Sequence, residues 1–111
     1  MEKLSVIVPC FNEQETLQDY YDAISKVRET LLGKECELQV ILVDDGSKDG
    51  TLEKMKELSG QCSWIRYISF TRNFGKEAAI YAGLTHAEGE YVSLMDVDLQ
   101  DPPSLLPEMF E

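Results

Sequence analysis

Basic residues are scarce in this sequence. Its 111 residues include 10 lysines and arginines against 21 aspartates and glutamates, a formal net charge of −11. No lysine or arginine follows Lys76. Proteins that bind nucleic acid or dock on anionic lipid need a basic patch, so the composition argues against both kinds of partner. The acidic last third of the chain is therefore either solvated or arranged to hold cations.

Cysteines and long apolar runs are also few. The three cysteines are widely spaced and form no C-x-x-C pair, which excludes a disulfide framework and a zinc signature. Cys10 lies in an apolar run and is expected to be a small core residue. No stretch approaches the roughly 20 apolar residues of a membrane span, and the short run at 6–11 does not make a signal peptide. We therefore expect a cytoplasmic chain with reduced thiols.

Short β-branched runs alternate with helical stripes along the chain. This pattern predicts one α/β domain with a Rossmann-like parallel sheet, right-handed crossovers and helices on both faces. The expected strands cover residues 4–9, 38–43, 64–70 and 91–95; the expected helices cover 12–33, a short segment after 50, 75–87 and a segment from Ser104 onward.

Two local features sharpen this prediction. Asn12 is a suitable N-cap for the first helix, with Glu15 at the capping-box position. The third strand carries apolar side chains on both of its faces, which predicts a strand covered on both sides.

The predicted strands all end in polar residues at the same edge of the sheet. Ligands of open α/β sheets bind beyond the carboxyl ends of the strands, so we expect one site there. The residues in question are Pro9, Phe11 and Glu13 after the first strand, Asp44 and Asp45 after the second, Arg72 and Lys76 after the third, and Asp96, Asp98 and Gln100 after the fourth.

Asp96 and Asp98 are the strongest metal-ligand candidates. In an extended segment, side chains two residues apart point the same way, and two carboxylates so placed favour a cation between them. Oxygen ligands of this kind suit Mg²⁺ or Mn²⁺, and the Gln100 amide could add a further oxygen. The alternative is a solvated turn.

The segment Asp44-Asp45-Gly46-Ser47 has three interpretations. It could be a turn that caps the next helix, a calcium loop or an acceptor for nucleoside N–H and hydroxyl groups. A calcium loop starting at Asp45 requires glutamate at its twelfth position, where this chain has Lys56, so we reject that interpretation. The chain also lacks G-x-G-x-x-G and the Walker lysine motif, which excludes dinucleotide and P-loop sites.

Four segments together resemble glycosyltransferase family 2, in particular its dolichyl-phosphate mannose synthase and bacterial polyisoprenyl-phosphate branch. They are VPCFNE at 8–13, VDDGSKDGT at 43–51, RNFGKE at 72–77 and MDVDLQDPP at 95–103. The resemblance implies the N-terminal nucleotide-binding half of a GT-A fold across residues 1–111. It also implies inverting sugar transfer from a UDP- or GDP-sugar.

The same resemblance assigns roles to individual residues. Pro9, Glu13 and Asp45 would line the pocket of the base and ribose, with Asp44 beside them, and Phe11 would also bind the nucleotide-sugar. Arg72 and Lys76 would lie near the phosphates. The metal and the diphosphate would meet Asp96, Asp98 and Gln100, with Mg²⁺ or Mn²⁺ as the ion.

In the family, the catalytic base comes from the second half of the domain, so we expect it beyond residue 111. The chain would then bind nucleotide and metal without turnover. The resemblance implies a lipid acceptor such as a polyisoprenyl phosphate, with the parent protein at the cytoplasmic face of a membrane and membrane association through a further C-terminal part. We also expect an uncovered sheet edge or apolar face to promote self-association. The alternatives are a phospho-acceptor signalling domain and a non-catalytic nucleotide-binding module.

Overall fold

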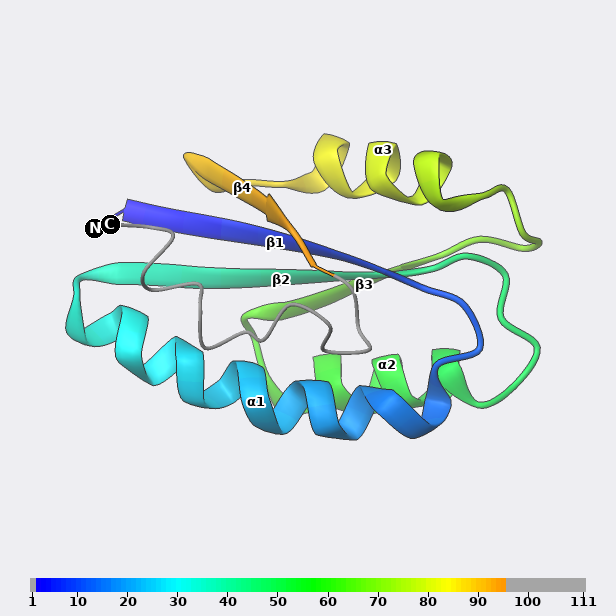
Figure 1. Ribbon diagram of the computed structural model, residues 1–111, viewed down its shortest axis with the longest axis horizontal. Coiled ribbons are helices and arrows are strands. Elements are labelled where there is room, and N and C mark those ends of the chain that lie inside the picture. Colours follow the sequence, from blue (N-terminus) through cyan, green and yellow to red (C-terminus); the bar gives the residue numbers. More distant parts are fainter. Residues whose placement is uncertain (1, 96–111) are drawn as a thin grey trace.

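A single parallel sheet organises the computed structural model, which describes residues 2–95 (Figure 1). Its strands, in chain order, are β1 (Glu2–Cys10), β2 (Cys36–Asp44), β3 (Ile65–Ser69) and β4 (Tyr91–Leu94), and their order in the sheet is β3-β2-β1-β4. The predicted α/β fold with a parallel sheet is confirmed. Doubly wound phospho-acceptor domains use the order 2-1-3-4-5, whereas 3-2-1-4 belongs to the Rossmann type, so the sheet order argues against that alternative.

Three helices in the described residues cover both faces of the sheet. They are α1 (Gln14–Gly33), α2 (Thr51–Gln61) and α3 (Lys76–His86). Figure 1 shows α1 and α2 together on one face and α3 on the other. This arrangement confirms the predicted helices on both faces. The helix predicted from Ser104 lies outside the described residues.

The central strands β1 and β2 are buried on both faces. Successive residues of a strand point to opposite sides, so Val6 and Val8 face the core under α1 and α2, while Ile7 and Ile41 face the core under α3. This double burial explains why both strands are nearly continuous apolar runs rather than alternating ones.

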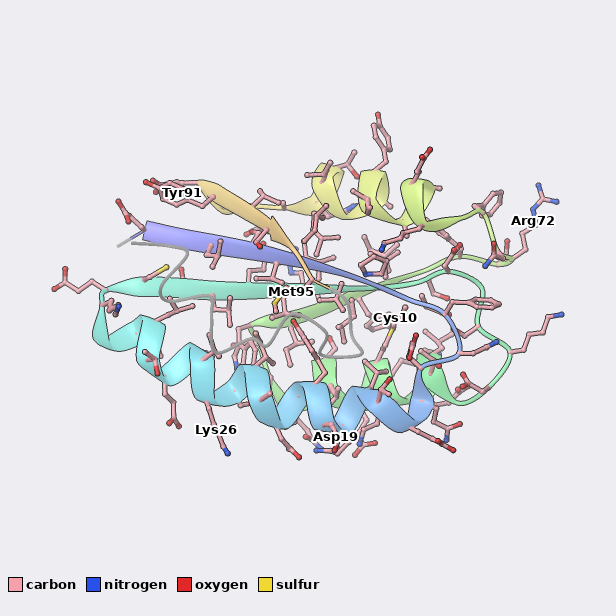
Figure 2. All side chains as sticks on the ribbon, in the orientation of Figure 1. Cys10, Asp19, Lys26, Arg72, Tyr91 and Met95 are labelled. Atoms are coloured by element: carbon pink, nitrogen blue, oxygen red, sulfur yellow. The ribbon has the colours of Figure 1, made fainter. Side chains whose placement is uncertain are left out.

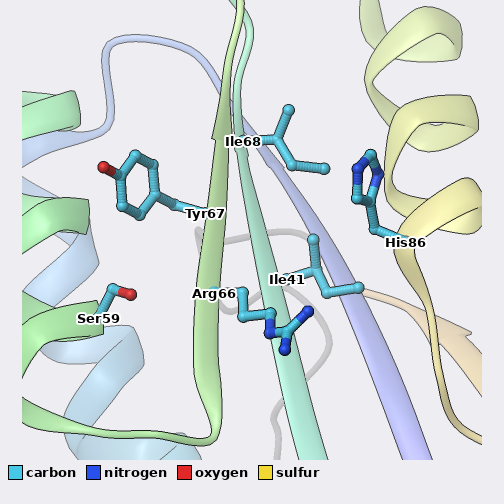
Figure 3. A pocket seen from close by; sticks show the side chains of 6 residues that line it. All are labelled: Ile41, Ser59, Arg66, Tyr67, Ile68 and His86. Atoms are coloured by element: carbon cyan, nitrogen blue, oxygen red, sulfur yellow. The ribbon is translucent and has the colours of Figure 1, made fainter.

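The prediction for the third strand is wrong in one respect. Only Ile65 of β3 is buried, while Arg66, Tyr67 and Ser69 are exposed. The cause is topological: β3 is an edge strand, and α3 packs over β1 and β2 instead. A hollow of about 340 Å³ borders β3. Figure 3 shows the Ile68 side chain on β3 pointing toward His86 of α3 across the gap between the strand and the helix.

The predicted cap of the first helix is also wrong. The helix begins at Gln14, and its N-cap residue Glu13 makes no side-chain capping hydrogen bond. Glu15 is therefore the second residue of the helix and does not occupy the capping-box position. Asn12 instead adopts the left-handed conformation, with φ at 54°. Its amide oxygen accepts a hydrogen bond from the backbone N–H of Lys48 at 2.9 Å, so this side chain serves a contact between two loops.

The apolar surface predicted to promote self-association lies on α3 and β4. The exposed side chains are Tyr81 and Leu84 on α3, and Tyr91, Val92 and Leu94 on β4. Self-association through this surface stays a prediction. Within residues 2–95, no helix combines the length and apolar character needed to cross a membrane.

The thiols should differ sharply in reactivity. All three are free; Cys10 and Cys36 are buried, and burial raises the pKa of both thiols, whereas Cys62 is half-buried. Because the thiolate is the reactive form, we expect DTNB to modify Cys62 first and the other two only as fast as the protein unfolds. Peptide mapping of the modified protein checks this, and Cys62→Ser should remove the fast phase. Rapid labelling of native Cys10 would contradict the buried position.

Candidate nucleotide site

Three loops meet at the carboxyl edge of the sheet, at the right-hand end of the view in Figure 1. They follow β1, β2 and β3 and cover residues 11–13, 45–50 and 70–75. The edge on which the sequence predicted a site is therefore where these loops gather. The fourth strand leads to the same edge, because the N–H of Met95 donates to the carbonyl of Ile7 at 3.1 Å.

Side chains and backbone amides join the first loop to the second. The N–H of Asn12 donates to Ser47 Oγ at 2.9 Å, and the N–H of Glu13 donates to Thr51 Oγ1 at 2.9 Å. In the opposite direction, the N–H of Gly50 donates to Gln14 Oε1 at 3.0 Å. These reciprocal bonds satisfy exposed helix-end amides of both α1 and α2 and fix the two loops against each other.

Asp44 joins the second loop to the end of β3. One carboxylate oxygen accepts from the N–H of Ser47 at 2.9 Å, and the other accepts from Ser69 Oγ at 3.1 Å. The side chain is only 2% exposed and does not line the pocket described below. The structure thus gives Asp44 a role in holding the loops.

Asp45 holds the start of α3. Its Oδ1 accepts from the N–H of Phe74 at 2.8 Å and of Gly75 at 3.2 Å, and its Oδ2 accepts from Gly75 at 3.1 Å. The N-cap residue of α3 is Gly75, which has no side chain to cap the helix. A carboxylate at this position also interacts favourably with the positive end of the helix dipole. Sequence reasoning missed this role, because the partners are 29 and 30 residues apart.

A pocket of about 200 Å³ opens between the loops. Its lining comprises Pro9, Cys10, Phe11, Glu13, Asp45 and Lys76. All of these except Cys10 are site residues predicted from the sequence. Cys10 is a core residue that also forms part of the pocket wall. In the sequence, only its position between Pro9 and Phe11 indicates that second role.

Lys76 gives the pocket lining its positive charge. Glu13 and Asp45 also line the pocket; Glu13 Oε2 accepts from Thr16 Oγ1 at 2.8 Å, and the Asp45 carboxylate accepts from backbone amides. Such a lining offers acceptors for N–H and hydroxyl groups and one ammonium group for an anion. This combination suits a nucleotide better than an uncharged ligand.

Arg72 lies apart from this pocket. Figure 2 shows it extending outward from the loop between β3 and α3. Its guanidinium lies 4.8 Å from the centroid of the Phe74 ring, which is half exposed and packs edge-on against Phe70. The start of α3 therefore supplies a cation to the pocket through Lys76, and the loop before it places a second cation, Arg72, at the outer rim.

The predicted metal ligands Asp96, Asp98 and Gln100 lie outside the described residues. Within residues 2–95, no three histidine, cysteine, aspartate or glutamate side chains gather closely enough to hold a metal ion. The described part of the site thus offers carboxylates and an ammonium group.

Comparison with known proteins places these features in context. The model of the family described as "Glycosyl transferase family 2" matches residues 5–111. A bactoprenol glucosyl transferase of Shigella phage SfV is 41% identical over 109 residues, which are 98% of this chain and 34% of that protein. The chain spans about a third of the length of the curated relatives that it matches.

Solved structures agree with the fold. The mannosyltransferase PcManGT of Pyrobaculum calidifontis, in complex with GDP-Man and Mn²⁺, superposes with a TM-score of 0.74 at 29% identity, covering 87% of this chain and 28% of that one. The TarS 1-349 protein of S. aureus, in complex with UDP, gives a TM-score of 0.72 at 27% identity, covering 86% of this chain and 27% of that one.

Proposed function

The chain belongs to glycosyl transferase family 2, and we propose that it forms the nucleotide-sugar-binding part of an inverting glycosyltransferase. The observation that carries the proposal is the pocket at the carboxyl edge of the sheet, where Glu13, Asp45 and Lys76 converge. The donor is a nucleotide-diphosphate sugar. Structures similar to this chain contain UDP in one case and GDP-Man in another, so both nucleotides are candidates.

Each side of the pocket has a chemical task in this proposal. Pro9, Phe11, Glu13 and Asp45 line the part that receives base and ribose, where carboxylates can accept from N–H and hydroxyl donors. Lys76 binds a phosphate oxygen, and Arg72 adds positive charge at the rim. Asp44 supports this arrangement through the loops that it joins.

A divalent metal completes the site in this proposal. Asp96, Asp98 and Gln100 would hold it, because carboxylate and amide oxygens are the ligands that Mg²⁺ and Mn²⁺ prefer. When bound, the ion would neutralise the charge that develops on the diphosphate leaving group. The Mn²⁺ in the similar mannosyltransferase structure supports this proposal.

The acceptor and the catalytic base belong to the larger enzyme. The bactoprenol glucosyl transferase relative supports a polyisoprenyl phosphate as acceptor. An inverting enzyme needs a carboxylate base to activate its acceptor, and we propose that this base lies outside residues 1–111. We further propose that the parent enzyme works at the cytoplasmic face of a membrane.

Calorimetry with UDP and GDP, each with and without Mn²⁺, tests the proposal. We expect one nucleotide to bind and the metal to strengthen its binding by about tenfold or more, a difference of about 1.4 kcal/mol. Asp98→Ala should remove the metal-dependent part of the affinity, because it removes a charged ligand.

Asp101→Ala is the matched control, since it deletes a carboxylate three residues away that has no proposed metal role. It should leave the metal dependence unchanged. Tight nucleotide binding without metal, unaltered in Asp98→Ala, would contradict the role given to the D-x-D segment. Absence of any nucleotide binding would contradict the proposed function as a whole.

A further inference from the structure

The loop at 70–75 carries Arg72, leads directly into Lys76 and lies against the turn formed by Asp44, Asp45 and Gly46. At one end, the N–H of Phe70 donates to the carbonyl of Asp44 at 2.9 Å. At the other end, the amides of Phe74 and Gly75 donate to the Asp45 carboxylate. The loop is thus bound at both ends, by Asp44 at the end of β2 and by Asp45, the first residue after that strand.

Gly46 brings the two loops into direct backbone contact between these anchors. A Cβ atom at this position would lie 2.3 Å from the carbonyl carbon of Arg72 and 2.4 Å from the nitrogen of Asn73. Gly46 also has a φ of 74°, a conformation that favours glycine. Only a residue without a side chain allows the loop to lie this close.

We infer that Asp45 is a positioning residue, whose carboxylate fixes the loop at 70–75 and the start of α3, and so places Lys76 for the phosphates of the nucleotide with Arg72 at the rim. The inference rests on the proposed function and deepens it. Both carboxylate oxygens are engaged by backbone amides, and the side chain is 5% exposed, so most of its hydrogen-bonding capacity is directed at the loop. Lys76 directly follows Gly75, so its backbone position is set by that contact.

The two roles of Asp45 predict different ligand dependence. If Asp45 acted only by contacting the base or ribose, its loss would weaken uridine and UDP by the same factor. If it positions the cations, its loss weakens UDP more than uridine, because only UDP carries phosphates. We expect Asp45→Asn, which keeps the shape but not the charge, to reduce UDP affinity about tenfold more than uridine affinity.

Gly46→Ala provides an independent variant that leaves the Asp45 carboxylate in place. The added methyl group would push against the backbone of Arg72 and displace the loop from the other side. Gly46 does not line the pocket, so a loss of UDP affinity without a matching loss for uridine would report loop position alone. The control is Gly60→Ala on α2, where a Cβ meets no atom within 4 Å.

The experiment measures uridine and UDP affinities by NMR titration with Mg²⁺ present, with guanosine and GDP as a second pair. Amide hydrogen exchange of Phe74 and Gly75 is recorded in the ligand-free protein. We expect faster exchange at both amides in Asp45→Asn, and UDP-selective losses in both Asp45→Asn and Gly46→Ala but not in Gly60→Ala.

Equal losses for uridine and UDP in Asp45→Asn would overturn the inference, as would Gly46→Ala with unaltered UDP affinity. Unchanged amide exchange in Asp45→Asn would overturn it as well. If the unaltered chain bound neither nucleotide, the proposed function would fail, whereas the exchange measurement would still decide whether Asp45 holds the loop.

Discussion

Replacing Lys76 with glutamate is expected to weaken UDP binding by about a hundredfold. A hydrogen bond between an ammonium group and phosphate contributes about 1.5–3 kcal/mol, and the new carboxylate adds repulsion. A loss of about 2.8 kcal/mol corresponds to a factor of a hundred. The effect should be large here because Lys76 is the cation of the pocket lining in a chain whose net charge is −11. Calorimetry at low ionic strength measures it.

Two features separate this effect from a loss of folding. Lys76 is the first residue of α3, where a negative side chain interacts favourably with the helix dipole, so Lys76→Glu should not destabilise the helix. Lys56→Glu, on the exposed side of α2, changes the net charge by the same amount away from the pocket. It should alter UDP affinity by no more than about threefold through long-range charge, which salt screens. Similar losses in the two variants would contradict a specific role of Lys76.

The polar strand ends illustrate how far the sequence predicts the site. Pro9, Glu13 and Lys76 lie in one pocket because parallel strands carry their carboxyl ends to the same edge, and periodicity is enough to reveal parallel strands. This inference needs no knowledge of loop conformation. The positions of these residues at the edge follow from the order of elements alone.

The roles of Asn12 and Asp45 could not be predicted in the same way. Local patterns suggested a helix cap for Asn12 and a ligand contact for Asp45, but their observed partners are 36 and about 30 residues away. Which donor reaches a side-chain oxygen depends on how the loops pack, and a short polar side chain competes for local and distant amides alike. The exposure of β3 could not be predicted for a similar reason. Whether a strand lies at the edge depends on the order of strands in the sheet and not on the residues of that strand.

These loop contacts also explain how an acidic protein can present an anion site. The two aspartates before Gly46 are nearly buried, and backbone amides or hydroxyls bond to both of their carboxylates. Hydrogen bonds to a carboxylate offset the desolvation of its charge. The two carboxylates thus hold the loop that carries Arg72 and the helix start that carries Lys76.

The close packing of α3 on the sheet predicts a large loss of stability when Gly83 is enlarged. Gly83 is buried where α3 crosses β1, and a Cβ added there would lie 2.4 Å from Ile7 Cγ2. Ile7 is fully buried in the middle of the sheet, so it has little room to move. Gly83→Val should therefore lower the free energy of unfolding by about 3 kcal/mol, the upper part of the usual range for overpacking.

Urea denaturation followed by circular dichroism measures this loss, and Gly60→Val on α2 is the matched control. A Cβ at Gly60 meets no atom within 4 Å, and valine is at least as good a helix former as glycine, so the control should change stability by no more than about 0.5 kcal/mol. Combining Gly83→Val with Ile7→Ala should cost less than the sum of the two single changes, because the smaller side chain makes room for the larger one. Equal midpoints for Gly83→Val and Gly60→Val, or strict additivity with Ile7→Ala, would show that α3 does not rest on Ile7 this closely.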